Sequence, residues 1–183
     1  MKMKNLHIIL VFASFVLFIV SMQIMRHYAN NVMEYNNEKI LDLRFGYSYD
    51  DVKHYANGLN DNGKNYYVKD FHLFDTFYPI IYGVFYILTL LYFIWNFLPK
   101  NRFVNLLLLI PIIGIICDYC ENILINSFIK NINNVSNNII TLSSLLTRTK
   151  FVAIYLSLLL VIILTVHNIW NKIKKANQRL TKR

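Results

Sequence analysis

Four long stretches of almost uninterrupted apolar residues divide the chain, at residues 7–25, 76–98, 103–125 and 151–170. A hydrocarbon core about 30 Å thick needs roughly 20 apolar residues in a helix to cross it, and each stretch is about that long. A helix satisfies all its own backbone groups within lipid. The pattern therefore predicts an all-α fold, an integral membrane four-helix bundle, with residues 1–183 forming a single membrane domain.

Local features of these stretches refine the prediction. Lys2 and Lys4 before the first stretch resemble the start of a signal peptide, but the apolar run is longer than usual and no small-x-small cleavage site follows it. We therefore expect an uncleaved first span. Pro79 falls in the first turns of the second span, where a missing N–H costs little, whereas Pro111 is central in the third and predicts a kink.

Residues 26–75 are the only sizeable polar segment, and they predict a short helical extracytoplasmic cap. Ser48 followed by Asp50 and Asp51 is typical of a helix start, with a hydroxyl cap and acids in the first turn. The apolar residues after it recur with helical spacing, at Val52, Tyr55 and Leu59. The pair 62–63 (Asn-Gly) indicates a turn, and helix is expected from Asn65 into the second span.

Composition and charge agree with a membrane location and indicate the orientation. Hydrophobic residues make up 56% of the chain and charged residues only 16%, too apolar for one soluble core. Ten of the 19 Lys and Arg residues fall in segments on the side of the termini, which contain no acid. The other nine lie in the remaining loops together with eight acids, so the net charge of those loops is close to zero. By the positive-inside rule, both termini are cytoplasmic in a multi-pass protein of the cell membrane.

The net charge of +9 is therefore a membrane feature, and we do not expect nucleic acid as a partner. The basic cytoplasmic tail, residues 171–183, is expected to contact anionic lipid headgroups, with the bilayer itself as the main partner. A second copy of the chain or another membrane protein stays open as a further partner.

Polar residues inside the third span are the main candidates for function. Asp118, Glu121 and Asn122 lie on one side of that helix, and charged residues within a span normally face protein or water. Topology brings further charged residues to the same outer end. They are His72 and Asp75 at the second span, Arg148 and Lys150 at the entrance of the fourth, and Arg26 at the end of the first.

Two interpretations of this group remain open. In the first it is a structural network, with Asp118 and Glu121 paired with Lys150, Arg148 or Arg26. In the second it lines a cavity for a ligand or cation. A metal is not expected, but if one bound, His72, Asp75, Asp118 and Glu121 would be its ligands.

Cys117 and Cys120 form a C-x-x-C pair within the third span. Four-span membrane oxidoreductases use such pairs but need a second, loop-borne pair, and this chain has only two cysteines. Packing residues are the better interpretation, and we expect no cofactor.

The chain contains, in this order, Leu41-Asp42-Leu43-Arg44, Gly46-Tyr47-Ser48, Gly63 and Tyr67, Asp75 with Pro79 and Tyr82, Asp118 with Glu121-Asn122, and Lys150. This order of residues resembles that of a family of small, uncharacterised four-span bacterial membrane proteins. The resemblance covers nearly the whole chain. It implies the architecture and that Asp75, Asp118, Glu121, Asn122 and Lys150 belong together, but it implies no activity.

We interpret the chain as a membrane protein whose outward-facing polar group is structural or binds a ligand or partner, without catalysis. One alternative is an enzyme acting on a lipid or prenyl substrate. In it Asp118 and Glu121 would be acid and base or metal ligands, and His72 and Asp75 would complete the site. A second alternative is a subunit that transports protons or cations past Asp118, which the apolar inner half of the third span argues against.

Overall fold

The computed structural model describes residues 2–99 and 101–180, and it is helical throughout with short connections. Lys100, Lys182 and Arg183, which contribute to the predicted orientation, lie outside the described residues. Four helical segments are long and apolar enough to cross a membrane: Asn5–Met33, Asp61–Phe97, Phe103–Lys130 and Asn137–Lys175. The predicted all-α bundle is confirmed, and the chain is a multi-pass membrane protein.

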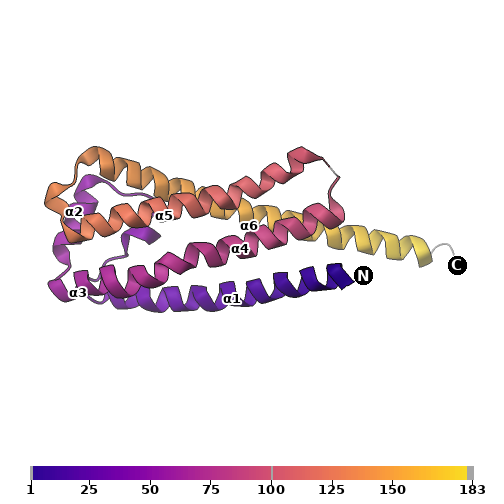
Figure 1. The fold of residues 1–183 in the computed structure, drawn as a ribbon, viewed down its shortest axis with the longest axis horizontal. Helices are drawn as coiled ribbons and strands as arrows, with labels where there is room; N and C mark the ends of the chain where they lie inside the picture. Colours follow the sequence, from indigo (N-terminus) through magenta and orange to yellow (C-terminus); the bar gives the residue numbers. More distant parts are fainter. Residues whose placement is uncertain (1, 100, 181–183) are drawn as a thin grey trace.

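The four long helices lie side by side along one axis, with both termini at the same end (Figure 1). They are α1 (Lys2–Met33), α4 (His72–Phe97), α5 (Leu109–Lys130) and α6 (Asn137–Leu180). Helix α1 packs on α4, α4 packs on α5, and α5 packs on α6. The main packing thus makes a curved row with α1 and α6 at its two edges, and α6 also touches α4.

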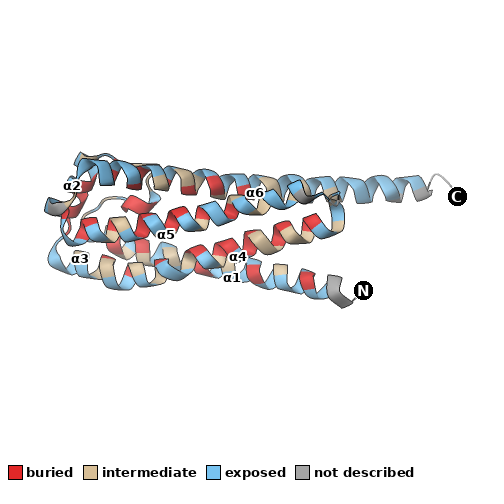
Figure 2. Ribbon diagram, turned by 45° about the horizontal axis from the view of Figure 1, so that its top comes forward, coloured by how far each residue is buried: buried red, intermediate tan, exposed pale blue. Residues whose placement is uncertain are grey.

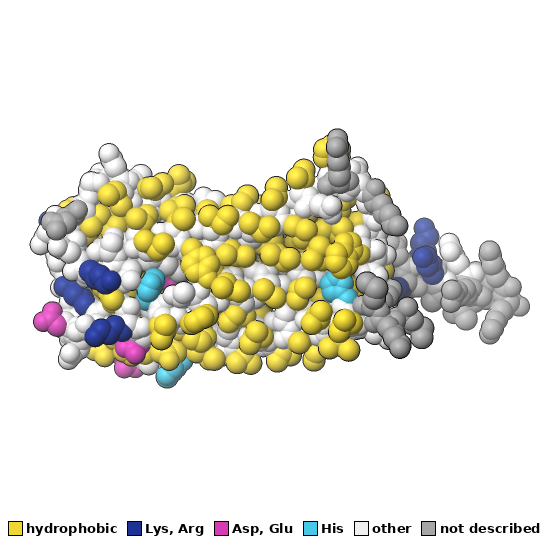
Figure 3. Space-filling view, viewed as in Figure 1, with side chains coloured by type: hydrophobic (Ala, Val, Ile, Leu, Met, Phe, Trp, Pro, Cys, Tyr) yellow, Lys and Arg dark blue, Asp and Glu magenta, His cyan; other side chains and the backbone are white. Residues whose placement is uncertain are grey.

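Apolar side chains cover the middle of the molecule and charged ones gather toward its ends, as Figure 3 shows for one face. Large hydrophobic residues such as Phe12, Ile116 and Ile163 are exposed on the long helices. A soluble monomer rarely exposes an apolar surface of this extent, so these faces belong in lipid. Small and polar residues instead line the helix contacts, with Ser14 and Ser21 buried on α1.

The helices extend well beyond the apolar stretches that predict them. Helix α6 begins at Asn137, more than three turns before the apolar stretch at residue 151, because no proline or glycine interrupts the segment between them. The second spanning segment begins at Asp61. Pro79 is therefore inside a long helix and not in its first turns, contrary to expectation.

The third span also differs from the prediction in detail. Residues Arg102–Leu108 form a 3₁₀ segment, η3, and α5 starts only at Leu109. Pro111 is accordingly the third residue of α5, which directly follows the 3₁₀ segment. The irregularity expected in mid-span is instead a change from 3₁₀ to α geometry just before the proline.

The cap closes the end opposite the termini and is made of short elements (Figure 1). These are the 3₁₀ turn η1 (Leu41–Leu43), α2 (Tyr49–Gly58), α3 (Asp61–Tyr66) and a π turn, η2 (Tyr67–Phe71), that leads into α4. A last 3₁₀ turn, η4 (Ile132–Asn134), joins α5 to α6. The helix predicted after Ser48 is confirmed, with a capping box between Ser48 and Asp51.

The turn predicted at the 62–63 pair is wrong, because both residues lie within α3. Asn60 caps this helix by accepting a hydrogen bond from the Gly63 N–H at 2.8 Å. Gly63 packs against the Tyr35 side chain, so its lack of a Cβ serves close contact here.

The most continuous apolar core lies under the cap rather than in the middle of the bundle (Figure 2). Tyr55 and Val52 of α2 pack there with Tyr67 and Phe71 of η2 and with Phe128 of α5. The cap is thereby held rigidly on the bundle. The packing of the cap places η1 beside α5, the helix that carries the buried acids Asp118 and Glu121.

Candidate functional site

Lys150 joins two acids of α5 in a buried ionic cluster, which consists of Asp118, Glu121 and Lys150. Its ammonium nitrogen lies 3.3 Å from Asp118 Oδ1 and 2.5 Å from Glu121 Oε2. The three residues are only 3%, 0% and 5% exposed. Of the three cations considered as partners for these acids, Lys150 is therefore the one that contacts both.

Lys150 reaches this position from the middle of a helix and not from the entrance of the fourth span, where it was expected. It lies 13 residues after Asn137, which is about 20 Å along α6. Gly114 of α5 packs closely on Ala153 of α6, which brings the two backbones together beside the cluster. The short separation lets a lysine on one helix bridge two carboxylates on the other.

Hydroxyl groups hold the remaining oxygens of the cluster. Tyr82 donates a hydrogen bond to Asp118 Oδ2 at 2.9 Å, and Thr147 donates to Glu121 Oε1 at 2.5 Å. Each carboxylate of the cluster thus has a lysine on one oxygen and a hydroxyl on the other. A buried charge group that is satisfied in this way is rigid.

The cap is tied to the same network through Tyr47. Its hydroxyl lies 2.7 Å from Ser143 Oγ, and its backbone N–H donates to Ser144 Oγ at 2.9 Å. Gly46 has a φ of +95°, which turns the chain so that Tyr47 points inward, and Arg148 packs over the space that a side chain there would fill. Burial raises the pKa of Tyr47, so its phenol keeps its proton.

Two further acids, Asp42 and Asp75, are buried nearby without a cation of their own. Tyr67 donates to Asp42 Oδ2 at 2.7 Å, whereas Asp42 Oδ1 has no hydrogen-bond partner among the described residues. Burial raises the pKa of Asp42, against the opposing effects of the Lys150 charge and the Tyr67 hydrogen bond. Asp75, only 5% exposed, makes no hydrogen bond or ion pair with any residue that the structure describes.

Asp75 occupies an irregular stretch of its helix. The π turn η2 ends at Phe71, and Pro79 follows Asp75 by four residues. A proline at that distance removes the helical hydrogen bond to the Asp75 carbonyl. Such interruptions of a helix are frequent at functional sites.

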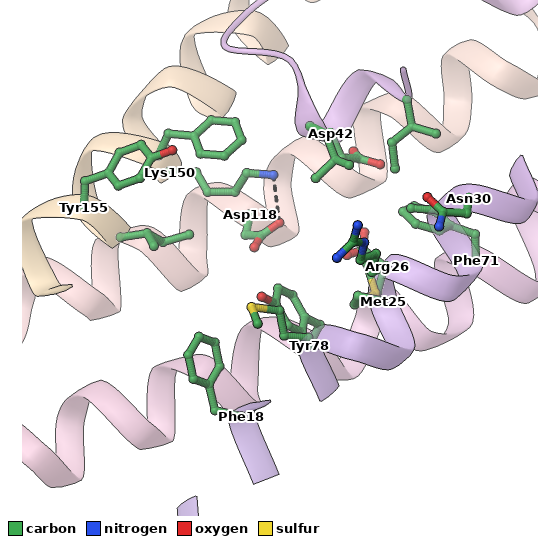
Figure 4. A pocket seen from close by; sticks show the side chains of 17 residues that line it. Phe18, Met25, Arg26, Asn30, Asp42, Phe71, Tyr78, Asp118, Lys150 and Tyr155 are labelled. Atoms are coloured by element: carbon green, nitrogen blue, oxygen red, sulfur yellow. Dashed lines mark hydrogen bonds and ion pairs between the residues drawn. The ribbon is translucent and has the colours of Figure 1, made fainter. Parts of the chain in front are cut away.

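Asp42, Asp75, Asp118 and Lys150 all border one cavity of about 570 Å³, the membrane cavity (Figure 4). Its walls are mainly apolar and come from α1, η1, η2, α4 and α6, with Asp118 contributed by α5. They include Phe18, Met22, Met25, Phe71, Tyr78, Phe151, Ile154 and Tyr155. Met22 of α1 and Tyr155 of α6 are exposed, so the cavity opens between these two helices onto the surface that faces lipid.

Of the other charged and polar residues predicted near the site, three lie apart from the cavity and one lines it. His72 is half-buried on α4 and Arg148 packs against the cap, and neither lines it. Asn122 is buried below the cluster, and neither atom of its amide has a hydrogen-bond partner among the described residues. Arg26, an exposed residue of α1, does line the cavity and points into it (Figure 4).

The structure does not assemble the metal site that His72, Asp75, Asp118 and Glu121 would form. Within the part of the chain described, no three His, Cys, Asp or Glu side chains are placed to hold a metal ion. Cys117 and Cys120 are both free thiols, the first buried and the second exposed.

Although Asp42, Tyr47 and Tyr67 are among the residues that carry the resemblance, sequence reasoning assigned neither these nor Thr147 to the site, and the main omission is Asp42. Its signal was an acid between two leucines, Leu41 and Leu43, in an otherwise polar loop. Leu41 is fully buried, and Asp42 beside it is buried as well. Sequence spacing could not show which helix end the loop covers.

Comparisons of the chain with protein-family models, curated proteins and solved structures found no match. The resemblance to small four-span bacterial membrane proteins therefore stays a prediction, and the function rests on the geometry of the site.

Proposed function

We propose that this protein binds the polar part of an amphiphilic molecule in the membrane cavity, without catalysing a reaction. The observation that carries the proposal is the cavity itself, which joins buried, unpaired acids to apolar walls and opens sideways between α1 and α6. A water-soluble ligand would have to pass through lipid to reach this opening. A molecule dissolved in the bilayer meets this opening directly.

The state of the ionic cluster favours binding over catalysis. An acid or base must be able to take up and release a proton at a reacting atom. Asp118 and Glu121 are instead each held by Lys150 and by a hydroxyl. Their arrangement supports a structural role, in which the cluster forms one wall of the cavity and joins α5 to α6.

Transport is less well supported because, among the described residues, the buried acids and Lys150 all lie in the half of the bundle nearer the cap. Toward the termini, the next hollow lies between α1 and α4. Among the described residues, apolar and aromatic side chains line it together with Thr89. A proton or cation would need polar groups or water along this path.

We also propose that the protein lies in the cell membrane with both termini cytoplasmic, so that the cavity belongs to the outer half of the bilayer. The uneven distribution of Lys and Arg supports this orientation. Lys172, Lys174 and Lys175 are exposed on the last turns of α6 and are suited to contact anionic headgroups.

A cavity-filling variant tests the binding function. Ile154 lines the cavity, whereas Ile163, further along α6, is 52% exposed to lipid. We expect long-chain lipids to raise the melting temperature of the delipidated wild type and of Ile163→Trp, but not of Ile154→Trp. Equal responses of the two variants to every lipid would show that the cavity binds none of them.

Orientation has an independent test in cells. Asp50→Cys in the cap and Lys172→Cys in the tail, each in a background with Cys117 and Cys120 changed to serine, are treated with a membrane-impermeant maleimide. We expect labelling of the cap cysteine in intact cells and of the tail cysteine only after lysis. The opposite pattern would reverse the proposed orientation.

A further inference from the structure

The acids around the membrane cavity outnumber the bases that could neutralise them. Asp42, Asp75 and Asp118 line it, and the ammonium of Lys150 is already shared between Asp118 and Glu121. Asp75 has no partner among the described residues, and Asp42 has one free oxygen. Buried carboxylates require a positive partner or a hydrogen-bond donor. The deep part of the cavity is therefore complementary to a cation with N–H groups.

The mouth of the cavity has the opposite charge. Arg26 of α1 lines it, is exposed, and makes no ion pair or hydrogen bond with another described residue. Figure 4 shows its side chain directed into the cavity from the α1 side. A guanidinium that is free in this way is well suited to bind a phosphate with two hydrogen bonds.

A second, apolar groove lies along α1 on the side of the cavity toward the termini. It has a volume of about 380 Å³ and is lined by Ile8, Val11, Phe12 and Phe15 of α1, by Phe85, Thr89 and Tyr92 of α4, and by Val161 of α6. Phe18, which lines the cavity, stacks on Phe85, which lines the groove, with ring centroids 5.2 Å apart. From Ile8 to Phe15 the groove extends about 10 Å along α1, enough to hold part of an acyl chain.

We propose that the ligand of the membrane cavity is an aminophospholipid, with its primary ammonium between Asp42 and Asp75, its phosphate at Arg26 and one acyl chain in the apolar groove. This inference rests on the proposed binding function and names its ligand class. The order of the three parts along the molecule matches a zwitterionic lipid of the outer leaflet. Its phosphate lies at the exposed mouth and its chain runs toward the bilayer centre.

Other lipid classes match fewer of these features. A phosphatidylglycerol or phosphatidic acid presents its phosphate to Arg26 but offers no cation to the acids. A diacylglycerol offers neither charge. A quaternary ammonium lipid has the positive charge but no N–H donor for the carboxylates.

The experiment is a competition measured by native mass spectrometry on the full-length protein in detergent. Dioleoyl phosphatidylethanolamine is added together with dioleoyl phosphatidylglycerol, phosphatidic acid or phosphatidylcholine of the same chains. We expect the ethanolamine lipid to be bound about tenfold in preference to each competitor in the wild type. Asp75→Asn should abolish the preference, whereas Asp70→Asn, the same change at an exposed position nearby, should keep it.

Further variants separate the parts of the proposal. Asp42→Asn should also reduce the preference, and it provides the same test if Asp75→Asn does not fold. Arg26→Gln should weaken all the phospholipids together and leave the choice among them. The head group without chains, glycerophosphoethanolamine, should bind much more weakly than the lipid.

Two negative results have different meanings. If a competitor binds as well as the ethanolamine lipid, or if both Asp→Asn variants keep the preference, the inferred head group is wrong, while binding in the cavity stands. If instead Ile154→Trp binds every lipid as the wild type does, the cavity is not the binding site and the proposed function fails with it.

Discussion

Glu121 and Lys150 form an ion pair in which both side chains are almost completely enclosed by protein. Glu121 Oε2 lies 2.5 Å from Lys150 Nζ, with side-chain exposures of 0% and 6%. Asp118 shares the same ammonium at 3.3 Å. The pair joins α5 to α6 within the membrane-spanning part of the bundle, where leaving any one of these charges alone would be costly.

Replacing Lys150 with methionine should therefore destabilise the protein strongly. The change leaves Asp118 and Glu121 together without a cation, which costs about 3–5 kcal/mol in buried pairs. Adding Glu121→Gln should recover part of this loss, because it removes one of the stranded charges. Unfolding in detergent measures the effect. The control is Lys53→Met, at an exposed position of α2. Equal stability of the Lys150→Met variant and the control would contradict the structural role of the cluster.

Tyr67→Phe should weaken the attachment of the cap. Among the described residues, the Tyr67 hydroxyl is the only side-chain group that donates a hydrogen bond to Asp42, at 2.7 Å. Without it both oxygens of a buried carboxyl are unpaired, and we expect a loss of about 1–3 kcal/mol in the free energy of unfolding. Tyr49→Phe, at a half-buried position of α2, is the matched control. Similar small losses in both variants would show that Asp42 finds another donor.

Asp42→Asn should make the protein more stable near neutral pH. Burial raises the pKa of Asp42 in the folded protein above its ordinary value of 3.8. A raised pKa means that the carboxyl contributes fully to stability below 3.8 and that this contribution is lost as the pH rises through the folded value. Asparagine carries no charge at any pH and still accepts from Tyr67.

The difference in unfolding free energy between Asp42→Asn and wild type should consequently shrink on acidification toward pH 3.8. Melting curves at a series of pH values measure it. Asp50→Asn controls for the loss of one negative charge on the exposed side of the cap. An advantage of Asp42→Asn that grows as the pH falls would contradict the assignment.

Ser48→Ala tests the capping box at the start of α2. The Ser48 hydroxyl accepts from the Asp51 N–H at 3.2 Å, and Asp51 Oδ2 accepts from the Ser48 N–H at 2.7 Å. The Ser48 N–H and the Ser48 hydroxyl both donate to Asp51 Oδ2, and these two hydrogen bonds lower the pKa of Asp51. We expect the variant to lose about 1 kcal/mol of stability. Its acid sensitivity should also decrease, because the contribution of Asp51 is present above the ordinary pKa and lost as the pH falls through the folded value.

Particular elements show how far sequence reasoning reaches for this protein. The hydropathy of α1 and the hydroxyl cap before α2 were sufficient to predict both helices, because these signals depend on neighbouring residues only. The start of α6 at Asn137 was missed because polar residues extend that helix beyond lipid, where hydropathy has no signal. Pro79 was placed too near a helix start for the same reason.

The candidate site divides in the same way. That Asp118 and Glu121 need partners follows from sequence, since charges in a span are costly wherever the helices lie. The choice of Lys150 over Arg148 and Arg26 depends on which faces of α5 and α6 meet, and hence on tertiary packing.

The sequence by itself determined the four spans, the helical cap and the presence of a polar group in the third span, because lipid imposes length and hydrophobicity on each segment separately. Only the tertiary structure decided that the turn carrying Asp42 packs on α5, that Asp75 lacks a partner among the described residues, and that a cavity opens between α1 and α6. These features arise where segments distant in the chain come together. Their positions depend on side-chain packing between helices, which no local pattern of residues encodes.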